Sequence, residues 1–156
     1  MQKEHHLSVT TLWTGNRGTG TSGYREYSRA HEISGEAKAC TIPGSSTPVF
    51  RGEKDRYNPE ELLIGSLSAC HMLWFLHLCA DAGLVVTEYS DEAEGIMQLN
   101  ADGSGQFTEV VLHPSVLLND RSKRHVLAAL HDRAHDLCFI ARSVNFPVRC
   151  EPRERE

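Results

Sequence analysis

Residues 58–83 read NPEELLIGSLSACHMLWFLHLCADAG, and this stretch decides the fold of the chain. Asn58 is a preferred residue at the start of a helix, and Pro59 suits the first helical position. Gly83 favours a C-terminal stop. No charged residue occurs from Leu62 to Ala80. The stretch therefore predicts a long helix that is apolar on every side, which is typical of a buried domain axis or of a membrane span.

The interruptions and the rest of the chain favour the buried axis. Four polar side chains divide the apolar run: Ser66, Ser68, His71 and His77. No second hydrophobic segment follows, and the flanks carry no basic bias. We expect no membrane partner. The helix is predicted to be the buried centre of a domain, with Cys70 in its middle.

Length and charge limit the other function classes. A chain of 156 residues predicts one domain, residues 1–156. A net charge of −5 and a pI near 6.0 provide no basic field, so we expect no nucleic-acid partner. The first residues, MQKEHHLSV, lack the apolar core of a signal peptide, which predicts a cytoplasmic protein. Five cysteines cannot all pair within one chain, which favours redox or metal-binding roles over a purely structural set of disulfides.

Strand patterns lie on both sides of the central helix. They cover residues 7–13, 24–33 and 36–42 before it, and residues 84–97, 106–113 and 115–118 after it. Residues 102–105, DGSG, predict a hairpin turn. A second helix is expected to begin at Asp120 or Ser122 and to continue to Ala141, and residues 147–150 could add a last strand. The predicted class is α+β, with largely antiparallel sheets around the buried helix.

Two cysteines lie on predicted helix stripes. Cys70 is on the central helix, and Cys138 is on the apolar stripe of the second helix. If those stripes pack together, the two sulfurs could approach each other. The simplest interpretation is that both are small core residues, because free cysteine is often buried. A catalytic role requires a lowered thiol pKa and a route for substrate.

The sequence FRGEKDRYNPEELLIGSLSACH, with the later Cys-Phe-Ile-Ala, resembles the OsmC/Ohr family of osmotically inducible and organic hydroperoxide resistance proteins. The order of elements agrees with that family over nearly the whole chain. The resemblance implies an OsmC-like fold and an interleaved homodimer. It also implies a cysteine-based peroxidase that reduces organic hydroperoxides in oxidative-stress defence.

The resemblance assigns roles to individual residues. Cys70 corresponds to the peroxidatic thiol and Cys138 to the resolving thiol, and the two would close a disulfide. Glu60 corresponds to a glutamate that orients a catalytic arginine near the thiolate. The implied reductant is a dihydrolipoyl group or another dithiol on a partner protein, with no metal, flavin or other cofactor.

The sequence departs from the family pattern at three places. Val49 stands where family members often carry arginine, and we expect Arg29 to replace it, with Arg51, Arg17 and Arg25 as alternatives. Phe139, Ile140 and Ala141 follow the second cysteine in place of proline, an aliphatic residue and serine. His71 replaces the common phenylalanine after the first cysteine.

Two other functions remain open at this point. His131, His135 and Cys138 could share one helix face, and with His77 or Cys70 they could hold a metal such as zinc. A non-catalytic module could instead bind a small apolar ligand in a core pocket. The other cysteines, Cys40, Cys79 and Cys150, are expected to be bystanders.

Overall fold

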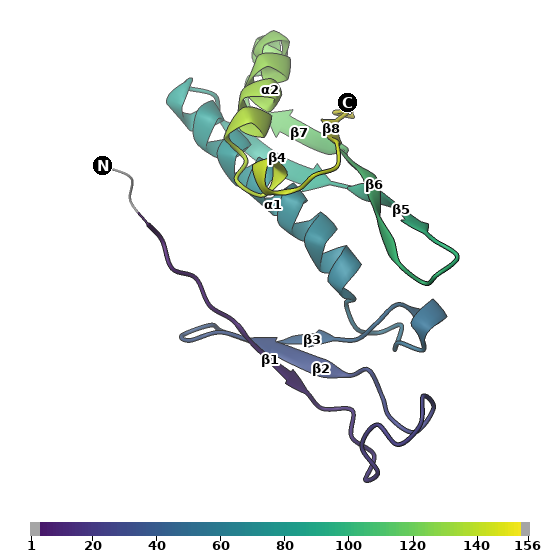
Figure 1. The fold of residues 1–156 in the computed structure, drawn as a ribbon. Helices are drawn as coiled ribbons and strands as arrows, with labels where there is room; N and C mark the ends of the chain where they lie inside the picture. Colours follow the sequence, from purple (N-terminus) through teal and green to yellow (C-terminus); the bar gives the residue numbers. More distant parts are fainter. Residues whose placement is uncertain (1–3, 154–156) are drawn as a thin grey trace. The chain divides into compact units, whose positions relative to one another are not determined.

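The computed structural model describes residues 4–153 and divides into two compact units, Met1–Leu62 and Leu63–Glu156. Figure 1 shows strands β1 to β3 in the first unit, and most of helix α1 with helix α2 and strands β4 to β8 in the second. Each unit is considered by itself.

The first unit is built on a small antiparallel sheet. Its strands, in the order β1-β2-β3, are Thr10–Trp13, His31–Ser34 and Ile42–Gly44. The Trp13 indole donates a hydrogen bond to the carbonyl of Ser28 at 2.8 Å. The Glu53 carboxylate accepts hydrogen bonds from the hydroxyls of Ser28 and Ser45. A short 3-10 helix, η1, covers Pro48–Phe50. Residues 24–30 are irregular, so the expected strand over residues 24–33 is wrong in its first seven positions.

Helix α1, Pro59–Asp81, has the limits that its sequence predicts. Asn58 accepts a hydrogen bond from the backbone N–H of Glu61 at 2.8 Å, and the Glu61 carboxylate accepts one from the backbone N–H of Asn58 at 3.0 Å. This reciprocal capping satisfies amides that would otherwise lack a partner at the helix start. At the other end Gly83 adopts a left-handed φ of 66°, which glycine does without a Cβ clash.

The second unit contains two sheets and one further helix. Its strands are β4 (Val86–Asp91), β5 (Glu94–Leu99), β6 (Gly105–Leu112), β7 (Pro114–Leu118) and β8 (Val148–Cys150). β4 pairs with β7, and the other sheet has the order β5-β6-β8. Between β7 and β8 the chain forms the 3-10 helix η2 (Arg121–Val126), helix α2 (Leu127–Leu137) and the 3-10 helix η3 (Ala141–Ser143).

The fold is α+β, with antiparallel pairing as expected except where β8 runs parallel to β6. The hairpin at residues 102–105 is confirmed and joins β5 to β6. The single strand expected over residues 84–97 is wrong: the chain leaves one sheet after Asp91 and enters the other at Glu94. The second helix is also shorter than expected, because its last residue is Leu137.

Helix α1 buries only one stripe within a single chain. The buried residues lie four positions apart, on one face: Leu67, His71, Phe75 and Cys79. The opposite stripe is exposed and contains Gly65, Ala69, Leu73 and His77. The helix is long and apolar enough to span a membrane by length and composition alone. Within residues 4–153 this face of the helix stays exposed, and Leu73 is 63% exposed.

Candidate active site

The thiols of Cys70 and Cys138 are hydrogen-bonded to each other. Cys70 projects from the middle of α1 and is half-buried, whereas Cys138 is buried. The structure thus brings together the sulfurs of Cys70 and Cys138, which the sequence assigns to two predicted helices. An adjacent pair of reduced thiols can be joined by a disulfide after one of them is oxidised.

Cys138 lies just beyond α2 rather than within it. The residue caps the helix with extended backbone angles, φ −66° and ψ 108°. Its sulfur accepts a hydrogen bond from the backbone N–H of Ala141 at 3.4 Å. The expectation of a helical Cys138 is therefore wrong, although the side chain still points to the buried side.

The environment of Cys138 favours the neutral thiol. Burial, the largest cause, and the neighbouring Cys70 thiol raise its pKa to about 11, while the Ala141 amide acts in the opposite direction. Near neutral pH this sulfur is protonated and a poor nucleophile. That state suits a thiol that waits for its partner to be oxidised.

Aromatic rings lie next to both cysteines along the chain. Trp74 follows Cys70 by one helical turn, and Phe139 follows Cys138 directly. The two rings meet edge to face with centroids 5.8 Å apart. Phe139 remains 67% exposed, so the ring pair offers apolar surface to solvent.

Glu60 lies on the first turn of α1, in the first unit. Its Oε2 atom is buried and has no hydrogen-bond partner within residues 4–153. A buried carboxylate oxygen without a partner is costly, so this atom is suited to accept a guanidinium N–H.

Arg29 makes its contacts inside the first unit. Its guanidinium donates to the carbonyls of Tyr27 and Tyr24 at 2.8 and 2.9 Å. The same group lies over both tyrosine rings, 4.2 and 4.4 Å from the centroids. The three alternatives, Arg17, Arg25 and Arg51, are exposed, and Arg51 has a left-handed φ of 66°.

The histidine cluster of the second unit differs from the one that the sequence suggested. Nε2 of His71 lies 3.0 Å from Nδ1 of His131, and Cys150 Sγ lies 3.6 Å from the same His71 nitrogen. Among residues 4–153, His71, His131 and Cys150 form the group whose potential metal-ligating atoms lie within 4.8 Å of one another. The group contains neither His135 nor Cys138. The metal set built on His131, His135 and Cys138 is therefore wrong, and Cys150, expected to be a bystander, belongs to the cluster.

Sequence reasoning missed His71 and Cys150 for different reasons. His71 shares the four-residue spacing of Leu67 and Phe75, so its burial could have been read from the helix pattern. Cys150 is brought in by β8, and nothing local in the sequence indicates that β8 pairs in parallel with β6.

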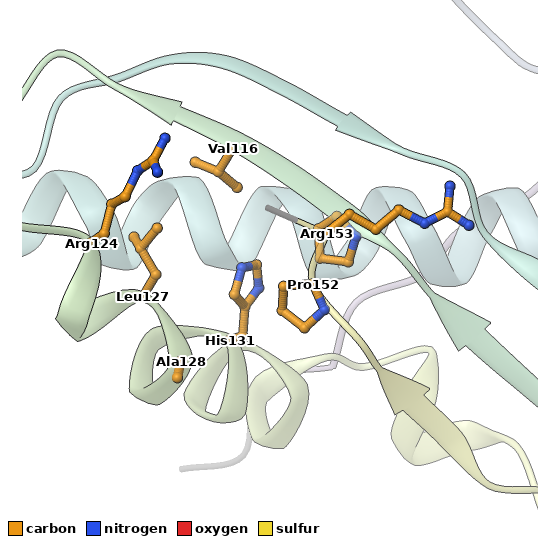
Figure 2. A pocket seen from close by; sticks show the side chains of 8 residues that line it. Val116, Arg124, Leu127, Ala128, His131, Pro152 and Arg153 are labelled. Carbon is orange, nitrogen blue, oxygen red and sulfur yellow. The ribbon is translucent and has the colours of Figure 1, made fainter. Parts of the chain in front are cut away.

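A pocket of about 280 Å³ opens beside His131. It is lined by Pro114, Val116, Arg124, Leu127, Ala128, His131, Pro152 and Arg153. Figure 2 shows the His131 imidazole between Leu127 and Pro152, with the two arginines at opposite ends. The lining is largely apolar, as expected for a small-molecule site.

The fold agrees with that of known proteins. The OsmC-like protein family matches residues 52–153, and the chain belongs to this family. The uncharacterized protein YmaD of Bacillus subtilis (strain 168) is 26% identical over 156 residues, covering 95% of this chain and 92% of its own.

Solved structures of similar fold cover almost the whole chain. An OsmC-like protein of unknown function from Vibrio cholerae is 32% identical, with a TM-score of 0.86 over 96% of this chain and all of its own. The organic hydroperoxide resistance protein OhrB of Bacillus subtilis is 18% identical, with a TM-score of 0.65 over 96% of this chain and 98% of its own. At 18% identity, the likeness to OhrB shows a shared fold and does not assign the activity of OhrB to this chain.

Proposed function

We propose that this protein is a thiol-dependent peroxidase that reduces organic hydroperoxides. The observation that carries the proposal is the hydrogen-bonded pair of Cys70 and Cys138 thiols. A peroxidase that cycles through a disulfide needs two reduced sulfurs within reach of each other. Membership of a family that includes organic hydroperoxide resistance proteins supports the same reaction.

The proposed reaction has three steps. The Cys70 thiolate attacks the terminal peroxide oxygen, the O–O bond breaks, and the alkoxide takes a proton to leave as an alcohol. Cys138 then attacks the Cys70 sulfenic acid, which forms the disulfide and releases water. An external dithiol, such as a dihydrolipoyl group on a partner protein, returns both cysteines to thiols and is itself oxidised to a disulfide.

The division of roles follows from burial. Cys70 is half-buried and can be reached by a substrate, whereas Cys138 is buried and its thiol pKa is raised to about 11. A protonated thiol does not compete for the peroxide. The ring pair of Trp74 and Phe139 would hold the alkyl or aryl part of the hydroperoxide.

The arginine of this mechanism is proposed to pair with the buried Oε2 of Glu60. A guanidinium held there would stabilise the Cys70 thiolate by its charge. Arg29 is the sequence-based candidate, and its role requires it to leave the carbonyls of Tyr24 and Tyr27 or to be shared with them.

A homodimer is part of the proposal. The exposed stripe of α1 contains small residues at positions 65 and 69, followed by Leu73. Covering this stripe with a second chain would bury apolar surface that a single chain leaves in water.

Replacement of each cysteine tests the proposal. With an organic hydroperoxide and a dithiol reductant, Cys70→Ser should abolish turnover because a serine hydroxyl does not attack the O–O bond. Cys138→Ser should consume about one equivalent, stop as a sulfenic acid and proceed to sulfinic acid in excess peroxide. Intact mass spectrometry should show a loss of two hydrogens in oxidised wild type, and a gain of one and then two oxygens in Cys138→Ser.

Exposed Cys40 is the matched control, and Cys40→Ser should keep wild-type turnover. Full activity in both the Cys70 and the Cys138 variant would refute the proposal.

A further inference from the structure

We infer that His71, His131 and Cys150 form a binding site for one transition-metal ion of the zinc type, separate from the Cys70–Cys138 pair. Their ligand atoms, two imidazole nitrogens and one sulfur, all lie within 4.8 Å of one another. The two histidines are buried and Cys150 is half-buried. Imidazole and thiolate are the ligands that borderline-soft ions prefer.

Two of the three ligand distances, both from His71 Nε2, are close to those around a tetrahedral ion. With Zn–N bonds of about 2.0 to 2.1 Å and a Zn–S bond of about 2.3 Å, tetrahedral angles require an N···N separation of about 3.3 Å and an N···S separation of about 3.6 Å. The structure has 3.0 Å between the two histidine nitrogens and 3.6 Å between Cys150 Sγ and His71 Nε2. An ion would replace the proton shared by His71 and His131, with a widening of roughly a few tenths of an ångström.

The protonation changes of such binding are simple. Each neutral imidazole keeps its one proton on the nitrogen that does not face the ion. The Cys150 thiol loses its proton to solvent and binds as thiolate. No oxidation or reduction is involved.

The charges around the cluster favour a cation. Asp91 acts electrostatically on both His71 and Cys150, and Asp132 and Glu151 also act on Cys150. The position of Asp91 is fixed, because its carboxylate accepts hydrogen bonds from the Ser68 hydroxyl at 2.6 Å and the His113 amide at 2.7 Å. Three ligands that are neutral without metal thus lie in a field of carboxylates, which a divalent ion would balance.

Two buried polar atoms beside the cluster have no hydrogen-bond partner in the part of the chain described here. They are Nδ1 of His71 and the hydroxyl of Tyr89. The hydroxyl lies close enough to Cys150 for the two groups to interact electrostatically. Buried polar atoms without a partner are costly, so this part of the second unit is not a sealed apolar core.

The pocket beside His131 would give an ion and a fourth ligand access from the His131 side; of the three ligands, His131 alone is among its lining residues. It holds about 280 Å³, and its imidazole wall is visible in Figure 2. Arg153 at one end is paired with Glu92, and Arg124 stands at the other. The basic ends suit an anionic or neutral fourth ligand, such as chloride or water. Catalytic zinc sites commonly keep such an exchangeable position.

Cobalt(II) is the probe for this site. Reduced full-length protein titrated with Co²⁺ without oxygen should bind one ion per chain and gain a near-ultraviolet thiolate-to-cobalt absorption. Cys150→Ser should lose that absorption, and His131→Gln should bind more than about tenfold more weakly. His135→Gln and Cys138→Ser are matched controls from the same segment, and both should behave as wild type.

X-ray absorption of the zinc-loaded wild type gives a second measurement that needs no variant. It should show two nitrogen ligands and one sulfur ligand. Absence of saturable binding would overturn the inference, as would a thiolate absorption that survives in Cys150→Ser or disappears in Cys138→Ser. Peroxide turnover is a separate readout, because it depends on Cys70 and not on this cluster.

Discussion

Trp74 and Phe139 meet edge to face, 5.8 Å between ring centroids, one helical turn beyond Cys70 and one residue beyond Cys138. The contact joins α1 to the segment that follows α2. Its place along the chain, next to both thiols, gives each proposed reaction partner an aromatic neighbour.

This contact predicts a substrate preference. Phe139→Ala should lower kcat/KM for cumene hydroperoxide by about fivefold to tenfold, because an aromatic contact contributes roughly 0.5–1.5 kcal/mol beyond area burial. Activity towards hydrogen peroxide should change little, since hydrogen peroxide has no apolar part. Leu99→Ala, another exposed apolar residue, should leave both substrates unaffected. An equal loss for both peroxides would indicate a disturbed site in place of a lost substrate contact.

A second prediction concerns the arginine. If Arg29 supplies the charge near Cys70, Arg29→Ala should slow alkylation of that thiol at neutral pH by about tenfold, which corresponds to one pKa unit. Peptide mapping after timed iodoacetamide treatment measures the rate. Glu60→Gln should slow alkylation in the same direction, because the guanidinium would lose its carboxylate partner. If Arg29→Ala left the alkylation rate of Cys70 unchanged and Arg51→Ala lowered it, the role would belong to Arg51.

A third prediction concerns assembly. Light scattering during size-exclusion chromatography should give the mass of a dimer for wild type. Leu73→Glu should shift the protein towards monomer, because it places a charge on the exposed stripe of α1. Leu99→Glu changes an exposed leucine of β5 in the same way and should remain dimeric. Wild type that elutes as a monomer at micromolar concentration would contradict the dimer.

A fourth prediction concerns pH. Burial lowers the pKa of both His71 and His131 from 6.5 to about 4; Asp91 opposes this for His71, while His135 adds to it. The unfolded chain therefore binds more protons than the folded chain between about pH 6.5 and pH 4. Stability should be greatest above pH 6.5 and should fall through that window on acidification, by on the order of 3 kcal/mol for each histidine.

Urea unfolding at pH 7 and pH 5, with a chelator present, measures this effect. His131→Phe should flatten the dependence, because phenylalanine can keep the ring stacking on Phe75 and cannot be protonated. His77→Gln removes an exposed histidine and should leave the dependence as in wild type. A wild-type stability that does not change between these two pH values would show that the buried pair is not neutral in the folded state.

Much of this fold could be predicted from local signals. Asn58 and Gly83 mark the ends of α1 because capping depends on the residue itself, and DGSG marks the β5–β6 turn for the same reason. The break between Asp91 and Glu94 had no such signal. Its two strands differ only in which sheet they join, and that choice is made by distant residues.

The candidate site also contains some contacts that could be predicted from the sequence and others that could not. The approach of Cys70 and Cys138 could be anticipated from the apolar spacing around them, although Cys138 lies one residue beyond the end of α2. The neighbours of His71 could not, because one comes from α2 and the other from β8, far along the chain. Arg29 could be proposed from its sequence context, but its contacts with Tyr24 and Tyr27 depend on how residues 24–30 fold back.

The parallel pairing of β6 with β8 has a consequence for the way the chain folds. An antiparallel neighbour can form as soon as a short turn closes, but β8 must return past η2, α2 and η3 before Val110 meets Val148. During synthesis, the residues of α1 and of the β5–β6 hairpin are made before those of β8. Until β8 is made, the edge of β6 at Val110 has no neighbouring strand, and His71 lacks its contact with Cys150. During synthesis this edge is the part of the second unit most open to chaperones and to wrong pairing with another nascent chain.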